Sequence, residues 1–244
     1  IFMEVLFQDN DHKNIVFTDL TSGKMVQANQ NIIIHKKEVF ILDPGGHKVY
    51  PKLLSEIGKI KKEAELKYIF MSHQDPDIVA ATNGWLMVTD ANALLPGLWS
   101  RFIPHFGVDD YLISRLTSIP DEGMELQLTD LTLKIIPAHF LHSPGNFSVY
   151  DPYSKILYSG DIGASLGMSY VYVSDFSEHI KYMEPFHKRY MASNKAIKRW
   201  LSLISDLDIE IIAPQHGAIM KGKDFIEKFK SWFSQLSCGV DLIF

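Results

Sequence analysis

The sequence predicts a mixed α/β fold, a four-layer αβ/βα sandwich in one domain over residues 1–244. Three observations lead to this prediction. Short apolar stretches typical of strands open the chain and return in its second half. Amphipathic stretches lie between and after them, so helices can cover the outer faces of two sheets. With 244 residues, 46% of them hydrophobic, the chain is long enough for one large core.

The amino-terminal part is predicted to contain short strands followed by a helix. Ser22-Gly23 and Pro44-Gly45-Gly46 mark turns, since glycine and proline favour turns. The helix is expected from Pro51 to Glu65, because proline is tolerated in a first turn and apolar residues recur on one face. The expected strands are residues 4–8, 14–19, 31–35 and 38–43.

The rest of the chain is predicted to supply the second sheet and more helices. From Tyr182 to Leu207 the chain is expected to be mostly helix, and Phe225, Phe229 and Phe233 repeat at helical spacing near the end. The expected strands are residues 92–96, 125–128 and 131–136, with a hairpin of residues 147–150 and 156–159.

One polar cluster follows a buried strand directly. Residues 67–71 are apolar, and His73, Asp75 and Asp77 alternate immediately after them. The residues after Asp77 suit a helix, so Asp77 could cap that helix. Two interpretations remain open at this point: the aspartates cap a helix beside an ordinary loop histidine, or all three side chains bind metal.

Similar polar residues follow three later apolar stretches. Residues 132–136 precede His142, residues 155–158 precede Asp161, and residues 209–212 precede His216. A sheet fixes the backbone at strand ends, while the loops there are free to carry polar side chains. The repetition favours the metal-binding interpretation.

The order of these motifs resembles the metallo-β-lactamase fold superfamily. His-x-Asp-x-Asp, His142, Gly-Asp161 and Gln-His216-Gly are most similar to the diiron domain of the flavodiiron proteins. Residues 40–46, with Asp43, and residues 141–147 are similar to further segments of that domain. The resemblance covers nearly the whole chain and implies the metallo-β-lactamase fold. Within the family, the chain resembles stand-alone oxygen-binding diiron proteins without a flavodoxin module.

The resemblance also implies a ligand set and a cofactor. The cofactor is a pair of iron ions with an oxo or hydroxo bridge, without flavin in this chain. Carried over residue by residue, the family pattern gives one metal His73, Asp75 and His142, the other metal Asp77 and His216, and both metals Asp161.

The chemistry of this ligand set favours iron over zinc. Three imidazoles and three carboxylates form an oxygen-rich set, whereas zinc relatives have more imidazoles. Ile78 stands where zinc members have histidine, and Asp75 stands where flavodiiron proteins usually have glutamate. Two divalent ions, three carboxylates and one hydroxide cancel in charge, which avoids the cost of burying net charge.

The remaining histidines have alternatives of their own. His139, three residues before His142, could orient a ligand or meet bound dioxygen, or it could have no role. The histidines outside the motifs are expected to be structural: His35, His47, His105, His179 and His187.

Three functions follow from this site. The chain could be a dioxygen-binding sensor in bacterial chemotaxis signalling, a reductase of dioxygen or nitric oxide fed by a separate electron donor, or, less favoured, a binuclear zinc hydrolase. The sequence ends about 30 residues after His216 without a phosphate-cradling loop, so a built-in electron source is not expected. The sensor is therefore favoured, with at most slow reduction of dioxygen or nitric oxide by an external reductant.

Composition limits the partners and the compartment. A net charge of −5 without a basic block argues against a nucleic-acid partner. The single cysteine, Cys238, suits the cytoplasm. The apolar opening is too short and acidic for a signal peptide, and no stretch suits a membrane span, so no membrane partner is expected. The resemblance implies dioxygen or nitric oxide as ligand, a chemotaxis kinase or receptor as partner, and a homodimer.

Overall fold

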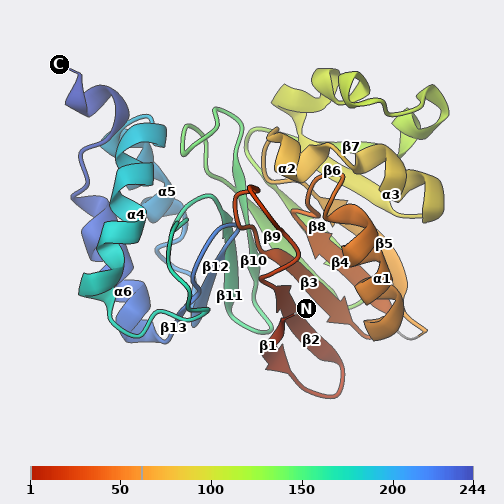
Figure 1. The fold of residues 1–244 in the computed structure, drawn as a ribbon, viewed down its shortest axis with the longest axis horizontal. Coiled ribbons are helices and arrows are strands. Elements are labelled where there is room, and N and C mark those ends of the chain that lie inside the picture. Colours follow the sequence, from red (N-terminus) through yellow and green to blue (C-terminus); the bar gives the residue numbers. More distant parts are fainter. Residues whose placement is uncertain (1, 62, 244) are drawn as a thin grey trace. The chain divides into compact units, whose positions relative to one another are not determined.

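The computed structural model describes residues 2–61 and 63–243. The chain divides into two compact units, Ile1–Thr132 and Leu133–Phe244. Sheets and helices occur throughout, which confirms the mixed α/β class (Figure 1). The expectation of one domain over residues 1–244 stays a prediction, and positions 1, 62 and 244 lie outside the described residues.

The sheet of the first unit follows the order of the chain from β1 to β7. Neighbours are antiparallel from β1 to β4 and parallel from β4 to β7, so the carboxyl ends of β4, β5 and β6 lie at one edge. The strands are β1 (Met3–Gln8), β2 (His12–Phe17), β3 (Gln30–His35), β4 (Glu38–Leu42), β5 (Glu65–Phe70), β6 (Asn92–Pro96) and β7 (Leu116–Ile119).

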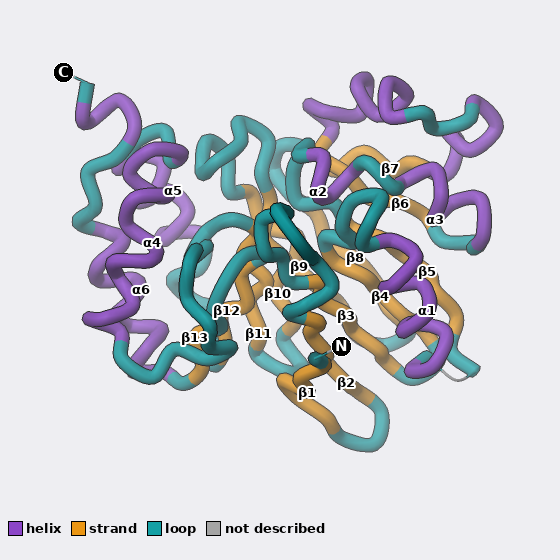
Figure 2. The backbone as a smooth tube through the Cα atoms, in the orientation of Figure 1, coloured by secondary structure: helices purple, strands orange, loops and turns teal. Residues whose placement is uncertain are grey.

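The first helix is shorter than predicted. α1 covers Tyr50–Ile60, with Pro51 in its first turn, rather than residues 51–65. The chain then turns through a bond from Ala64 N to the Lys61 carbonyl, and Glu65 already pairs with Glu38 of β4. Strand pairing thus ends the helix early. Figure 2 shows α1 in purple with the short helical segments that follow: α2 (Pro76–Val79), α3 (Thr82–Val88), η1 (Gly97–Phe106) and η2 (Asp110–Arg115).

The second sheet has the order β13-β12-β11-β10-β9-β8. β11 and β12 are parallel, so Asp161 and His216, which follow them, leave the same edge of the sheet. The strands are β8 (Met124–Leu128), β9 (Leu131–Pro137), β10 (Phe147–Asp151), β11 (Ile156–Gly160), β12 (Ile211–Pro214) and β13 (Met220–Lys221).

Residues 182–207, predicted to be mostly helix, belong to two helices, α4 (Phe176–Tyr190) and α5 (Asn194–Leu203), with a break between them. Between them, Met191 forms an isolated bridge with Leu141. The Ser193 side chain then caps α5 by accepting a hydrogen bond from Ala196 N at 3.4 Å. The break therefore ties the helices to the loop that carries His142.

Each unit has its own apolar core. In the second unit, α4, α5 and α6 (Lys223–Ser234) gather beside the sheet (Figure 1) and bury Trp200, Phe229 and Phe233. In the first unit, Leu53 and Ile57 of α1 join the core of the sheet. In the part of the chain that the structure describes, no helix is both long and apolar enough to cross a membrane.

Candidate metal centre

In the first unit, the ligand-type residues follow β5. Asp75 is the N-cap residue of α2, a role for which the sequence suggested Asp77. Asp75 caps through its backbone carbonyl, which accepts from Ile78 N at 2.9 Å, and its carboxylate makes no cap hydrogen bond. That carboxylate instead lies 3.6 Å, at Oδ2, from His73 Nε2. The interpretation in which Asp75 only caps a helix therefore loses its support.

The orientation of His73 is set by its neighbours. Its Nδ1 shares a hydrogen bond of 2.9 Å with Ser72 Oγ, and Ser72 N donates to Asp43 Oδ1 at 2.8 Å. Asp43 directly follows β4 and has a left-handed backbone with φ of 51°. Since Nδ1 is engaged by Ser72, Nε2 is the nitrogen that faces Asp75 and suits a metal ion.

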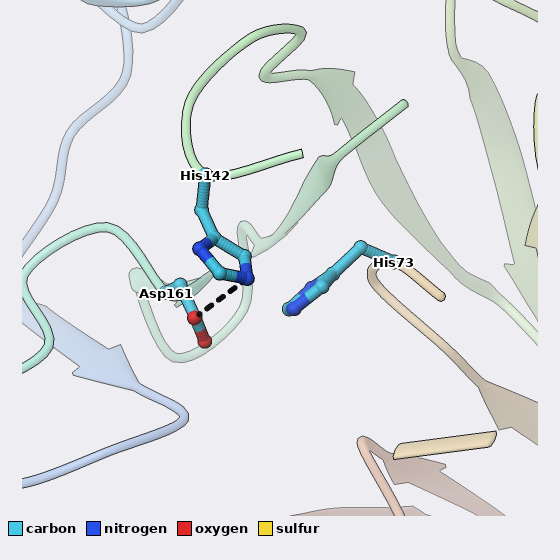
Figure 3. A group of neighbouring side chains, drawn as sticks. All are labelled: His73, His142 and Asp161. Atoms are coloured by element: carbon cyan, nitrogen blue, oxygen red, sulfur yellow. Dashed lines mark ion pairs between the residues drawn. The ribbon is translucent and has the colours of Figure 1, made fainter. Parts of the chain in front are cut away.

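In the second unit, Asp161 lies between two imidazoles. Its Oδ2 lies 3.5 Å from His142 Nε2, the pair joined by a dashed line in Figure 3, and its Oδ1 lies 3.5 Å from His216 Nε2. Asp161 is buried in a tight turn after β11, closed by a bond from Ile162 N to the Ser159 carbonyl. Each carboxylate oxygen thus faces a different imidazole.

His142 lies in a strained loop that many bonds hold in place. It has a φ of 71°, in the left-handed region that non-glycine residues rarely adopt. Asn146 Nδ2 donates to the Leu141 carbonyl at 2.8 Å, and Phe140 N donates to the Ser143 carbonyl at 2.9 Å. These bonds stabilise a backbone conformation that aims the His142 ring at Asp161.

His216 is held by close contact between two loops. Ser165 N donates to the His216 carbonyl at 3.2 Å, and Ser165 Oγ accepts from Ala218 N at 3.0 Å. Gly217, with φ of +83°, permits this approach, since a Cβ there would lie 2.1 Å from Ser165 Oγ. Gln215 N also donates to the Gly160 carbonyl at 2.7 Å, which ties the His216 loop to the strand before Asp161.

These separations suit pairs of ligands to a shared ion. Two atoms that each lie about 2.1 Å from one ion are about 3.0 to 3.6 Å apart when the angle at the ion is about 90° to 120°. The 3.5 Å and 3.6 Å distances fall within that interval. The two oxygens of Asp161 face different imidazoles, and the predicted role of this carboxylate as a bridge between two ions stays a prediction.

Most of the predicted site residues are thus placed in ligand-like contacts. Within the described residues, His73, His142 and Asp161 form a group that could hold a metal ion (Figure 3). Asp77 lies in the first turn of α2, and its role as a ligand stays a prediction. His139 packs edge-on against Phe147, with ring centroids 5.2 Å apart, and its role also stays a prediction.

Sequence reasoning missed the contacts that α4 makes with the candidate site. His187, expected to be an ordinary structural histidine, accepts a hydrogen bond from Gly163 N at 2.9 Å, two residues after Asp161. Burial lowers the pKa of His187 to about 4, so its ring is neutral at neutral pH. Phe186 stacks on His142 with ring centroids 5.6 Å apart. No local pattern signals these contacts, because they join a helix to loops more than 20 residues away.

Comparison with known families agrees with this geometry. The family model described as ODP family beta lactamase matches residues 26–217. The chain belongs to this family. The resemblance to metallo-β-lactamase-fold diiron domains, predicted from the motif order, is thereby confirmed.

Two solved structures of the chemotaxis sensor ODP match this ODP-family chain over nearly its whole length. The peroxy diiron species of the chemotaxis sensor ODP is 41% identical, covers 100% of this chain and 98% of its own, and superposes with a TM-score of 0.89. The apo state of chemotaxis sensor ODP from T. denticola is 40% identical, covers 99% and 97% of the two chains, and gives a TM-score of 0.88.

More distant proteins also match most of the chain. The flavodiiron core of Flv1 from Synechocystis has a TM-score of 0.77 at 14% identity, over 96% of this chain and 61% of that chain. An uncharacterised protein of Methanocaldococcus jannaschii is 28% identical over 212 residues, which are 84% of this chain and 52% of that protein. The chain spans about half the length of the curated relatives that it matches.

Proposed function

We propose that this chain is a diiron protein that binds dioxygen and acts as an oxygen sensor in bacterial chemotaxis signalling. The observation that carries the proposal is the likeness to the chemotaxis sensor ODP, at 41% identity over the whole chain, in its peroxy diiron species. The likeness to flavodiiron cores supports the fold alone, because identity there is 14%.

The proposed ligand set is the one that the family resemblance implies. His73 and Asp75, 3.6 Å apart, would share one ion with His142, and His216 would hold the second ion with Asp77. Asp161 would bridge the two, because its two oxygens approach different imidazoles at 3.5 Å each. The full set is His73, Asp75, Asp77, His142, Asp161 and His216.

The types of side chain in the proposed ligand set favour iron, and neighbouring residues hold two of the ligands in place. The proposed residues would hold two ferrous ions, which when bound would supply a site for dioxygen and one electron each. Carboxylates of three aspartates suit hard, oxygen-preferring ions better than the imidazole-rich sets of zinc enzymes. His73, which is buried, has its orientation fixed by Ser72, and Phe186 covers one face of the His142 ring. These contacts restrict the orientation of the His73 and His142 rings.

The setting of the sensor is part of the proposal. We infer a cytoplasmic homodimer that signals to a chemotaxis kinase or receptor. The single cysteine, Cys238, is a free and buried thiol, and burial raises its pKa to about 11. A free thiol without a disulfide suits a reducing compartment. The partner proposal rests on the likeness to ODP, which is a chemotaxis sensor.

The decisive experiment measures metal content and oxygen uptake together. The protein is loaded with ferrous iron without oxygen, mixed rapidly with oxygenated buffer, and followed by its optical spectrum and by an oxygen electrode. We expect two irons per chain, one rapid uptake of oxygen and a spectrum that persists for minutes. NADH alone should not sustain uptake.

Three other outcomes would contradict parts of this proposal. Continuous uptake at tens of turnovers per second with an artificial electron donor would identify a dioxygen reductase, since such rates are typical of enzymes. Retention of two zinc ions after iron-replete expression would favour a hydrolase. Sedimentation of the iron-loaded protein as a monomer would contradict the proposed homodimer.

A further inference from the structure

One buried histidine of α4 contacts the turn that carries Asp161. His187 Nδ1 lies 2.7 Å from the Met183 carbonyl, which can only accept, so Nδ1 carries the proton. In this tautomer Nε2 has a free lone pair, and it accepts the hydrogen bond from Gly163 N at 2.9 Å. The helix backbone thus selects the tautomer that can hold the turn.

That hydrogen bond fixes a specific peptide plane near the bridging carboxylate. Gly163 has a φ of +85°, and the preceding turn is closed by the bond from Ile162 N to the Ser159 carbonyl. With the Gly163 amide held by His187, the peptide between Ile162 and Gly163 cannot rotate freely. The backbone of Asp161, one residue earlier, is therefore held from both sides.

The next residue of the helix contacts a second ligand. Phe186 stacks on the His142 ring, with an interplanar angle of 27°. One turn of α4 therefore contacts the His142 ring and the turn that follows Asp161, and the ligand atoms of His142 and Asp161 lie 3.5 Å apart.

We propose that His187 is a positioning residue for Asp161, which acts through the Gly163 amide to keep the bridging carboxylate at its distance from His142. This inference rests on the proposed function, in which Asp161 and His142 hold iron. His187 itself touches no ion. Its effect is on the affinity and geometry of the site, as with other groups that orient metal ligands.

Two variants distinguish the effect of losing the hydrogen bond to Gly163 from the effect of losing the imidazole ring. His187→Gln has an amide at the same number of bonds from Cβ as Nε2 and can still accept from Gly163. His187→Asn has an amide at the level of Nδ1, so it can reach Met183 but not Gly163. The same change two helical turns earlier, His179→Asn, is the matched control, since the buried His179 shares its Nδ1 hydrogen bond with Tyr170 rather than with Gly163 or a predicted metal ligand.

The measurements are anaerobic titration of each apo protein with ferrous iron and the amide exchange rate of Gly163 in the apo protein. We expect His187→Asn to bind iron about 10- to 100-fold more weakly than wild type and to exchange the Gly163 amide faster, while His187→Gln and His179→Asn stay close to wild type. Equal iron affinity in all four proteins, or equal losses in the Gln and Asn variants, would overturn the inference. If wild type binds no iron, the proposed function fails, while slow Gly163 exchange in wild type and fast exchange in His187→Asn would still support the positioning bond.

Discussion

His142 Nε2 and Asp161 Oδ2 lie 3.5 Å apart, although the two residues come from separate loops and His142 has a left-handed backbone. A distance of this size is long for a charge-assisted hydrogen bond but suits two ligands of one ion. The strained backbone agrees with this role, because unusual conformations persist at functional sites where the surrounding structure holds them. The pair is thus organised for a ligand that both residues share.

The first prediction concerns the bridge. Asp161→Ala should lose or scramble the metal pair, because each of its oxygens faces a different imidazole. Elemental analysis after iron loading should find clearly fewer than two irons per chain. His139→Ala is the control and should keep about two irons while changing only the kinetics of oxygen binding. Equal metal loss in both variants would show that the ligand assignment is wrong.

The second prediction concerns the loop of His216. Gly217→Ala should displace this loop, because the new Cβ would lie 2.1 Å from Ser165 Oγ and 2.2 Å from the Ser165 carbonyl oxygen. We expect a loss of several kcal/mol in unfolding free energy, as for severe overpacking, and weaker iron binding.

Gly167→Ala is the matched control for that change. Gly167 has a φ of +86°, close to the +83° of Gly217, but nothing lies within 4 Å of its added Cβ. Its cost should therefore be the backbone strain alone, about 1 kcal/mol, with normal iron content. Similar denaturation midpoints for the two variants would show that crowding against Ser165 is unimportant.

The third prediction concerns strain next to His142. Phe140 has a φ of 64° and a side chain that is 56% exposed. Phe140→Gly should therefore be more stable than Phe140→Ala by about 1 kcal/mol, since glycine adopts this conformation without strain. In α6, the exposed Ser231 should show the opposite order, with Ser231→Ala more stable than Ser231→Gly by about 0.5 to 1 kcal/mol. Urea denaturation of the four variants measures both differences.

Much of the candidate site could be predicted because its signals are local. An apolar strand followed by His73 and Asp75, or by Asp161, places a polar side chain at a strand end, and β5 and β11 have the expected positions. The motif order then identified the family, which the match over residues 26–217 confirms. Strand ends are predictable because alternation and turn residues lie within a few positions of each other.

The contacts that tune the site were not predictable, because they are not local. The bond from Gly163 to His187 joins residues 24 positions apart, and a buried helical histidine looks like any core residue in sequence. The break at Met191 was missed for the same reason, since apolar periodicity continues through it while the chain pairs with Leu141. Helical periodicity also extended α1 past Ile60, where pairing of Glu65 with Glu38 decides the boundary.

The last prediction concerns the pH dependence of stability. Burial lowers the pKa of His179 from 6.5 to about 4, and among the described residues its Nε2 has no hydrogen-bond partner. The unfolded chain therefore binds a proton near pH 6.5 that the folded chain binds only near pH 4. Between these values the unfolded state holds more protons, so stability should fall as pH falls, by up to about 1.4 kcal/mol per pH unit from this group.

His179→Asn tests this contribution, since asparagine keeps a polar group near Tyr170 but does not titrate. Chemical denaturation of the wild type and the variant at a series of pH values should give curves that run parallel above about pH 7 and converge as the pH falls from about 6.5 to about 4. Groups that are shared by both proteins and do not interact with His179 cancel in the difference. A difference in unfolding free energy that stays constant over this interval would mean that His179 titrates normally in the folded protein.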